Sequence, residues 1–187
     1  MAETTAQIKS RSDAALDKEG KYLTFALAHE EYGLEILKVR EIIGYIDVTA
    51  VPQTPHYVKG VINLRGQVIP VVDLRAKFGM ETAGVTDETC IIVVEITHGN
   101  RKFNTGIVVD HVQEVLDIPG GNIEEAPQFG ASVSTDFILG MGKVGESVKI
   151  LLDIDRVLTG SGLGNLAHSG LDGPAAEQTP DPNERTS

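Results

Sequence analysis

The chain has 187 residues, 41% of them hydrophobic, which fits one ordinary folded domain or two small ones that share a core. Its formal net charge of -11 argues against nucleic-acid binding, because contacts to phosphates need clustered Lys and Arg. No window approaches about 18 uninterrupted apolar residues, and the chain does not begin with a basic and then an apolar stretch. We therefore expect a cytoplasmic protein without a secretory signal and without direct membrane insertion.

The two ends of the chain differ in composition from its middle. Residues 1–19 are polar with weak helical spacing, and residues 160–187 are rich in Gly, Ser, Pro and acidic groups. Neither end has enough apolar side chains to offset the entropy that is lost on ordering. We expect a flexible segment over 1–19, a folded domain over 20–159 and a disordered tail over 160–187.

Short runs of β-branched and aromatic residues fill the middle, separated by Gly, Pro, Asn and Asp. The first run, YLTFAL, places Leu23, Phe25 and Leu27 on one face of a half-buried strand. Later runs are EEYGLEI, VREIIGYI, QVIPVVDL, CIIVVEI, FNTGIVVD, VQEVLDI and VKILLDI. This pattern predicts a mainly β fold, with short helices at LRAKFGM and DIDRVLTG.

The sequence contains an internal repeat. GVINLRGQVIPVVDLRAKF, from Gly60, aligns without a gap on GMGKVGESVKILLDIDRVL, from Gly140. Upstream, YGLEILKVREI aligns on TGIVVDHVQEV, but fewer residues separate these two stretches than separate Gly60 from Gly140. The second copy is therefore longer between its two aligned stretches, and we place the additional residues in a loop. We infer two related β subdomains, about 20–80 and 88–159, each of about five short strands curled into a small barrel.

Several motifs that resemble cofactor or catalytic sites lack the context those sites need. GMGKVG at 140–145 matches the G-x-G-x-x-G string, but the residues after it alternate as in a strand, so the glycines fit a hairpin turn better. The five histidines and the single Cys90 show no metal-ligand spacing, and no serine lies in a nucleophile elbow. We expect no cofactor and no metal, and Cys90 fits a strand of the core.

Asp73 and Asp153 permit two interpretations. They could form a pair of carboxylates for acid–base catalysis in a small β-barrel enzyme. However, they occupy equivalent strand ends in the two copies, directly before the two short helical stretches. The simpler role, which we favour, is to cap each helical turn by accepting backbone N–H bonds.

Arg65 lies between apolar strands in the stretch N-L-R-G at 63–66, where the second copy has K-V-G-E. The turn can therefore form without asparagine or arginine, and these side chains are free to serve another purpose. An arginine held in a tight turn offers five fixed donors to a carboxylate or carbonyl of a partner. The alternative is a bond to a carboxylate within the chain.

Three stretches, EEYGLEILKVREI, VPQTPHYVKGVINLRGQVIPVVDLRAKF and GIVVDHVQEVLDI, strongly resemble the CheW family of chemotaxis coupling proteins. The resemblance covers about residues 20–159. It implies two SH3-like five-stranded barrels around a shared hydrophobic core, similar to the regulatory domain of the kinase CheA. It also implies a non-enzymatic adaptor, without catalytic residues or cofactors, that joins the cytoplasmic tips of methyl-accepting chemoreceptors to CheA in membrane-associated arrays.

The resemblance further implies where partners bind. Carried over position by position, the receptor-facing groove would involve Ile36, Val39, Glu41, Gly60, Asn63, Leu64, Arg65 and Val112. The kinase contact would use the exposed end of one barrel against a barrel of the CheA regulatory domain. A scaffold of another receptor–kinase pathway would share this groove, so the sequence leaves that alternative open beside the small β-barrel enzyme.

Overall fold

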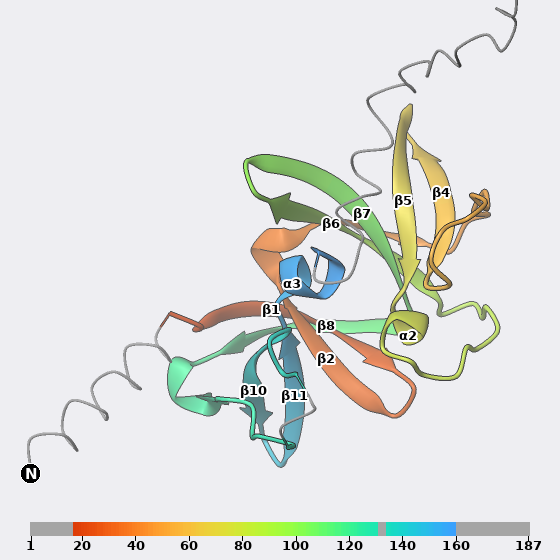
Figure 1. Ribbon diagram of the computed structural model, residues 1–187. Coiled ribbons are helices and arrows are strands. Elements are labelled where there is room, and N and C mark those ends of the chain that lie inside the picture. The colour runs from red at the N-terminus through yellow and green to blue at the C-terminus, as the bar shows by residue number, and fades with distance from the viewer. Residues whose placement is uncertain (1–16, 131–133, 160–187) are drawn as a thin grey trace, which may run out of the picture.

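The computed structural model describes residues 17–130 and 134–159 (Figure 1). The fold is mainly β with short helices, as the sequence predicts. The strands are β1 (Gly20–Leu27), β2 (Glu30–Glu35), β3 (Val39–Gly44), β4 (Val58–Leu64), β5 (Gln67–Asp73), β6 (Cys90–His98), β7 (Arg101–Val109), β8 (His111–Ile118), β9 (Ile123–Glu124), β10 (Ile138–Val144) and β11 (Ser147–Leu152). The helical segments are η1 (Ile36–Lys38), α2 (Leu74–Lys77), η2 (Gly120–Asn122) and α3 (Ile154–Thr159).

The strands form two sheets. One has five strands in the order β3-β6-β7-β5-β4, and the other has six in the order β8-β1-β2-β11-β10-β9. The sixth strand is the two-residue β9, which pairs with β10 in the longer loop of the second copy. In the first copy an isolated bridge between Thr49 and Val61 takes the equivalent place. The two sheets therefore have the same plan.

The sheets do not divide at the boundary expected between residues 80 and 88. Strands β1 and β2 of the first copy lie in the sheet of β8, β10 and β11, whereas β6 and β7 of the second copy join β3, β4 and β5. Two parallel pairings carry this exchange, with Gly33 opposite Leu151 and Gly106 opposite Val71. The repeat aligns the two glycines with each other and the two apolar residues with each other, so the pairings are equivalent. Each copy therefore contributes strands to both sheets, which sequence similarity between the copies does not reveal.

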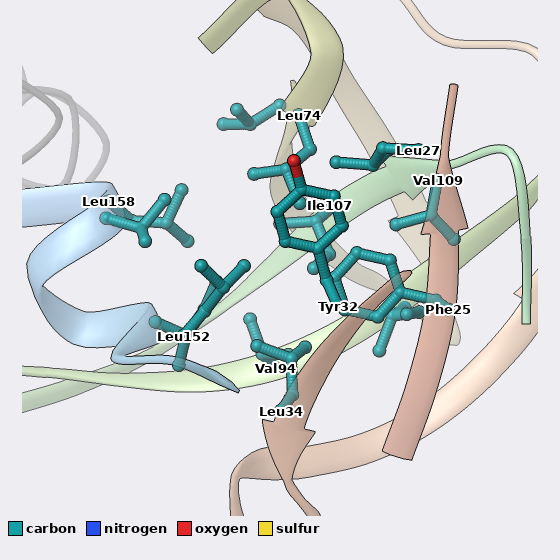
Figure 2. Close-up of a cluster of buried hydrophobic side chains, with 14 of the residues drawn as sticks. Phe25, Leu27, Tyr32, Leu34, Leu74, Val94, Ile107, Val109, Leu152 and Leu158 are labelled. Carbon is teal, nitrogen blue, oxygen red and sulfur yellow. The ribbon is translucent and has the colours of Figure 1, made fainter. Parts of the chain in front are cut away.

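Three apolar clusters hold this arrangement together. The largest lies between the two sheets and includes Phe25, Leu34, Ile107, Leu152 and Leu158 (Figure 2). Each sheet also covers a smaller cluster with its other face, one around Ile69 and Val71 and one around Tyr22 and Leu151. Successive residues of a strand point to opposite faces, so Val71 and Val72, like Leu151 and Leu152, enter different clusters.

The two short helices begin as predicted. Oδ1 of Asp73 accepts a hydrogen bond from the backbone N–H of Ala76 at 3.3 Å, and Oδ1 of Asp153 accepts one from Arg156 at 3.2 Å. Each aspartate thus satisfies one of the N–H groups that the first turn of a helix leaves without a partner. The capping interpretation is confirmed at both equivalent positions.

The glycine string at 140–145 lies in β10 and in its turn to β11, where Gly145 has a φ of 60°. It is a hairpin, as the repeat predicts. Within the described residues, no group of His, Cys, Asp and Glu side chains is placed to hold a metal ion. None of the helices in this part of the chain is long and apolar enough to cross a membrane.

Candidate partner-binding site

The turn between β4 and β5 places Arg65 at the tip of a hairpin. Arg65 and Gly66 are its two central residues and both have positive φ, 53° and 85°, as a type I′ turn requires. Oδ1 of Asn63 accepts a hydrogen bond from the Gly66 N–H at 2.8 Å and braces the turn. A left-handed conformation costs a residue with a side chain about 1 kcal/mol, so an arginine is not what this turn prefers.

The guanidinium of Arg65 reaches across the sheet to Glu41 on β3. Its Nη1 lies 3.2 Å from Oε1 and its Nη2 lies 2.9 Å from Oε2, a two-pronged ion pair. Because β3 and β4 are the two edges of the five-stranded sheet, the pair bridges edges that are far apart in the strand order. The alternative of a carboxylate within the chain is therefore correct for the isolated protein.

This ion pair is too exposed to hold the sheet together. The Arg65 side chain is 78% exposed and that of Glu41 is 23% exposed. Pairs in such surroundings contribute at most about 1 kcal/mol, because water and salt screen the attraction. The pair therefore orients the guanidinium and leaves most of its surface available to another molecule.

Gly60 allows the backbone beneath the turn to pack closely. A Cβ added at Gly60 would lie 1.9 Å from the carbonyl oxygen of Thr49, and its φ of 142° also favours glycine. Thr49 and Val61 exchange two backbone hydrogen bonds of 2.9 Å, which bring the segment after β3 against β4. Gly60 thus shapes the site without presenting a side chain of its own.

The other predicted residues separate into two groups. Ile36 on η1, Val39 on β3 and Val112 on β8 are partly buried against the cluster between the sheets. Leu64 packs against the small cluster of the five-stranded sheet, next to the turn. Strand β3 connects the groups, because it carries Val39 and, two residues later, Glu41.

Three exposed apolar residues extend the first group and were not predicted. Leu37 is 91% exposed, Ile42 43% and Val115 48%. Ile42 pairs with the core residue Ile92 and Val115 with Leu23, which places both beside the cluster between the sheets. We call these six residues, three partly buried and three exposed, the apolar rim: Ile36, Leu37, Val39, Ile42, Val112 and Val115. The upstream part of the repeat aligns Ile42 with Val115, a signal that could have identified both.

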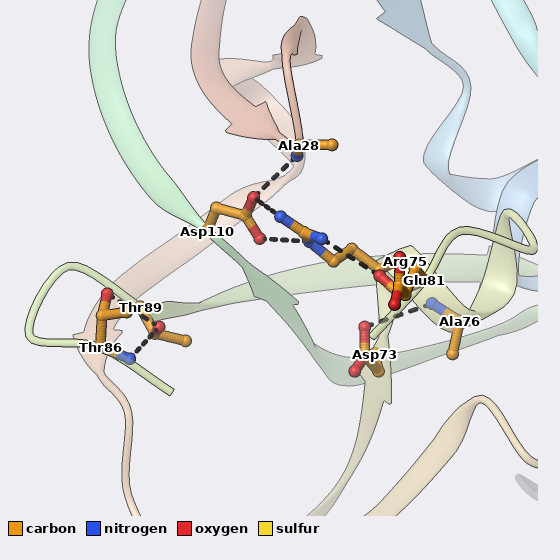
Figure 3. A network of polar contacts seen from close by, with 8 residues as sticks. All are labelled: Ala28, Asp73, Arg75, Ala76, Glu81, Thr86, Thr89 and Asp110. Atoms are coloured by element: carbon orange, nitrogen blue, oxygen red, sulfur yellow. Dashed lines mark hydrogen bonds and ion pairs between the residues drawn. The ribbon is translucent and has the colours of Figure 1, made fainter. Parts of the chain in front are cut away.

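Another group of charged residues fastens the two copies together (Figure 3). Arg75 of α2 donates from Nε to Oδ1 of Asp110 at 2.7 Å and from Nη2 to Oδ2, which also accepts from the Ala28 N–H at 2.7 Å. Burial raises the pKa of Asp110, but the bonds from Arg75 and Ala28 outweigh it and leave the pKa lowered. This carboxylate is satisfied and charged, which fits a structural contact better than acid–base chemistry.

Comparisons with known proteins give one consistent result. A family model described as CheW-like domain matches residues 21–161. The chemotaxis protein CheW of Klebsiella aerogenes is 42% identical over 139 residues, which cover 74% of this chain and 81% of that protein. The chemotaxis protein CheW of Treponema pallidum is 28% identical over 155 residues, or 83% of this chain and 91% of that protein. The crystal structure of the scaffolding protein TtCheW from Thermoanaerobacter tengcongensis superposes with a TM-score of 0.66 at 35% identity, over 75% of this chain and 93% of that chain.

Proposed function

As a member of the CheW-like domain family this chain is an adaptor of chemotaxis signalling, and we propose that it couples transmembrane chemoreceptors to the histidine kinase CheA. It acts in the cytoplasm, is recruited to membrane-associated receptor arrays and catalyses no reaction. The observation that carries the proposal is the combination of the apolar rim with the exposed guanidinium of Arg65. Both lie at positions where the sequence resembles the coupling proteins.

Each part of the site has a separate task in this proposal. The apolar rim buries apolar side chains of the receptor tip, and exposed apolar surface of this kind is typical of protein interfaces. Arg65 exchanges its internal partner Glu41 for a carboxylate or carbonyl of the receptor, with Asn63 keeping the turn in place. The regulatory domain of CheA binds the exposed end of one sheet.

The two alternative functions have less support. Both aspartates of the enzyme hypothesis cap helices, and each has a basic neighbour, with Lys59 4.0 Å from Asp73 and Arg156 3.5 Å from Asp153. Both carboxylates are therefore already engaged in structural contacts, which supports the capping role over catalysis. A scaffold in another pathway would use the same groove, but the similar proteins named above are chemotaxis proteins.

The substitution Arg65→Asn tests the proposal without harming the turn. Asn-Gly is a favoured pair for a type I′ turn, so the hairpin should form at least as well as with Arg-Gly. We expect binding to a receptor cytoplasmic fragment, measured by calorimetry, to weaken by about tenfold or more, which is about 1.4 kcal/mol. The melting temperature should stay the same or rise.

Lys143 provides a matched control on the equivalent hairpin, where its Nζ lies 2.6 Å from Glu124 at the surface. Lys143→Asn should leave receptor binding unchanged. If Arg65→Asn binds the receptor fragment as tightly as the unmodified chain does, the turn is not part of the receptor site. If the unmodified chain binds neither receptor fragments nor CheA, the adaptor proposal fails.

A further inference from the structure

A hollow of about 560 Å³ lies where α2 and α3 approach each other. Phe78, directly after α2, and Phe137, directly before β10, form two of its walls, with their ring centres 5.6 Å apart. Val157 of α3 contributes a further apolar wall, and Ser134 lies at an exposed part of the lining. Since Phe78 belongs to the first copy and Phe137 to the second, the hollow exists only when both copies are folded together.

The hollow combines an aromatic interior with positive charge. A row of aromatic rings leads from the hollow into the core. The ring centres of Phe78 and Tyr32 are 5.9 Å apart, and those of Tyr32 and Phe25 are 5.8 Å apart. Lys77 and Arg156 contribute cationic side chains to the lining, against the single carboxylate of Asp136. Such a surface suits a peptide that has apolar side chains followed by acidic ones.

The chain itself supplies a segment of that kind. Thr159 lines the hollow, and residues 160–187 follow it in the sequence. Leu163 and Leu166 come four and seven positions after Thr159, within reach because an extended residue spans about 3.5 Å. The remainder of the segment has four acidic residues, Asp172, Glu177, Asp181 and Glu184, against one basic residue, Arg185.

We propose that this tail folds back on its own domain, with Leu163 and Leu166 in the hollow and the acidic residues beside Lys77 and Arg156. Attachment at Thr159 holds the leucines at an effective concentration of about millimolar, so a weak contact is sufficient. The tail then covers the aromatic surface at which the two copies meet. The hollow shares no residue with the partner-binding site, so this proposal stands or falls separately from the adaptor function.

Fluorescence can report the position of the tail, because the chain has no tryptophan. In the full-length protein, Leu163→Trp should emit at shorter wavelength and be quenched by acrylamide severalfold less than Gln178→Trp, a control farther along the tail. Adding Ser134→Phe, which fills part of the hollow, should return the Leu163→Trp emission to that of the control. Adding Arg156→Glu should weaken the protection, whereas Arg101→Glu on the exposed start of β7 should not.

Hydrogen exchange on the natural sequence removes the influence of the tryptophan. Backbone amides of α2 and α3 should exchange severalfold more slowly in the unmodified chain than in the double variant Leu163→Ser, Leu166→Ser. Identical exchange in both proteins, together with equal quenching of the two tryptophan variants, would overturn the proposal. Protection that increases with protein concentration would also overturn it, since the tail would then bind a second copy.

Discussion

Thr105 on β7 has a buried hydroxyl group that makes no hydrogen bond to the described residues. Its side chain is fully buried, and its Oγ1 has no partner among residues 17–130 and 134–159. A buried hydroxyl in this state destabilises a protein by about 1–3 kcal/mol. We expect Thr105→Val to raise the free energy of unfolding by about 1 kcal/mol in denaturant titrations.

Thr24 on β1 is the matched control, because it is equally buried and fully bonded. Its Oγ1 donates to the Glu114 carbonyl at 2.9 Å and accepts from the Glu114 N–H at 3.3 Å. Thr24→Val should therefore lower the free energy of unfolding by about 1–2 kcal/mol. If both substitutions change stability in the same direction, the hydrogen-bond explanation is wrong.

The residues of the site were predicted to different extents from the sequence. The turn at Arg65 could be predicted, because the flanking glycines and the repeat are local signals in the sequence. Its partner Glu41 was named as a site residue but not as the bonded carboxylate, since their contact depends on how the sheet curls. The exposure of Leu37 was also hidden, because an apolar residue in a short run is more often buried than exposed.

At the scale of elements, the end of β2 places a carboxyl group in unfavourable surroundings. The pKa of Glu35 is raised by burial and by the negative charges of Asp153 and Asp155, while Lys38 partly offsets them. The pairing of β2 with β11 causes this crowding, because it brings Glu35 beside the capping residue of α3.

The raised pKa predicts a pH-dependent effect of Glu35→Gln. The folded state favours the protonated carboxyl, so its contribution to stability is present below the ordinary carboxyl pKa and is lost as pH rises through the raised value. The amide never ionises. Glu35→Gln should therefore be more stable than the unmodified chain at pH 7, and this difference should shrink below about pH 4.

Thermal unfolding of both proteins across this pH range checks the prediction, with Glu88→Gln in the exposed segment before β6 as a control. The control should show no gain in stability at pH 7. If the stability gained by Glu35→Gln over the unmodified chain is smaller at pH 7 than at pH 4, the stated effect of Asp153 and Asp155 is wrong.

The helices and most strands were predictable because their signals are local. Leu23, Phe25 and Leu27 enter one cluster as their alternation predicts, and both capping aspartates lie where a strand pattern stops. The pairing of β2 with β11 and of β5 with β7 was not predictable. Equivalent strands of the two copies have similar apolar patterns, so the pattern does not decide which copy a strand joins.

For the whole molecule, the exchange of strands predicts that neither half folds alone. A chain divided between residues 84 and 85, in the exposed segment before β6, gives fragments 1–84 and 85–187. Each sheet then lacks the strands that the other fragment supplies. Separately, the fragments should show no cooperative unfolding by circular dichroism. Mixed at equal concentration, they should form a one-to-one complex with the spectrum of the intact chain.

Subdomains that fold independently of each other would give the opposite result in the same experiment. If 20–80 and 88–159 were independent units, fragment 85–187 would unfold cooperatively without its partner. An intact-like melting transition for that fragment alone would show that pairing between the copies is unnecessary for folding.

The parallel pairing of β2 with β11 also has a consequence for synthesis of the protein. Tyr32 of β2 pairs with Ile150 of β11, so β2 leaves the ribosome long before the strand that pairs with it has been synthesised. During translation the free edge of β2 and the apolar face beside it have no native cover. Because unpaired strand edges promote aggregation, we expect the incomplete chain to aggregate more readily than the finished one.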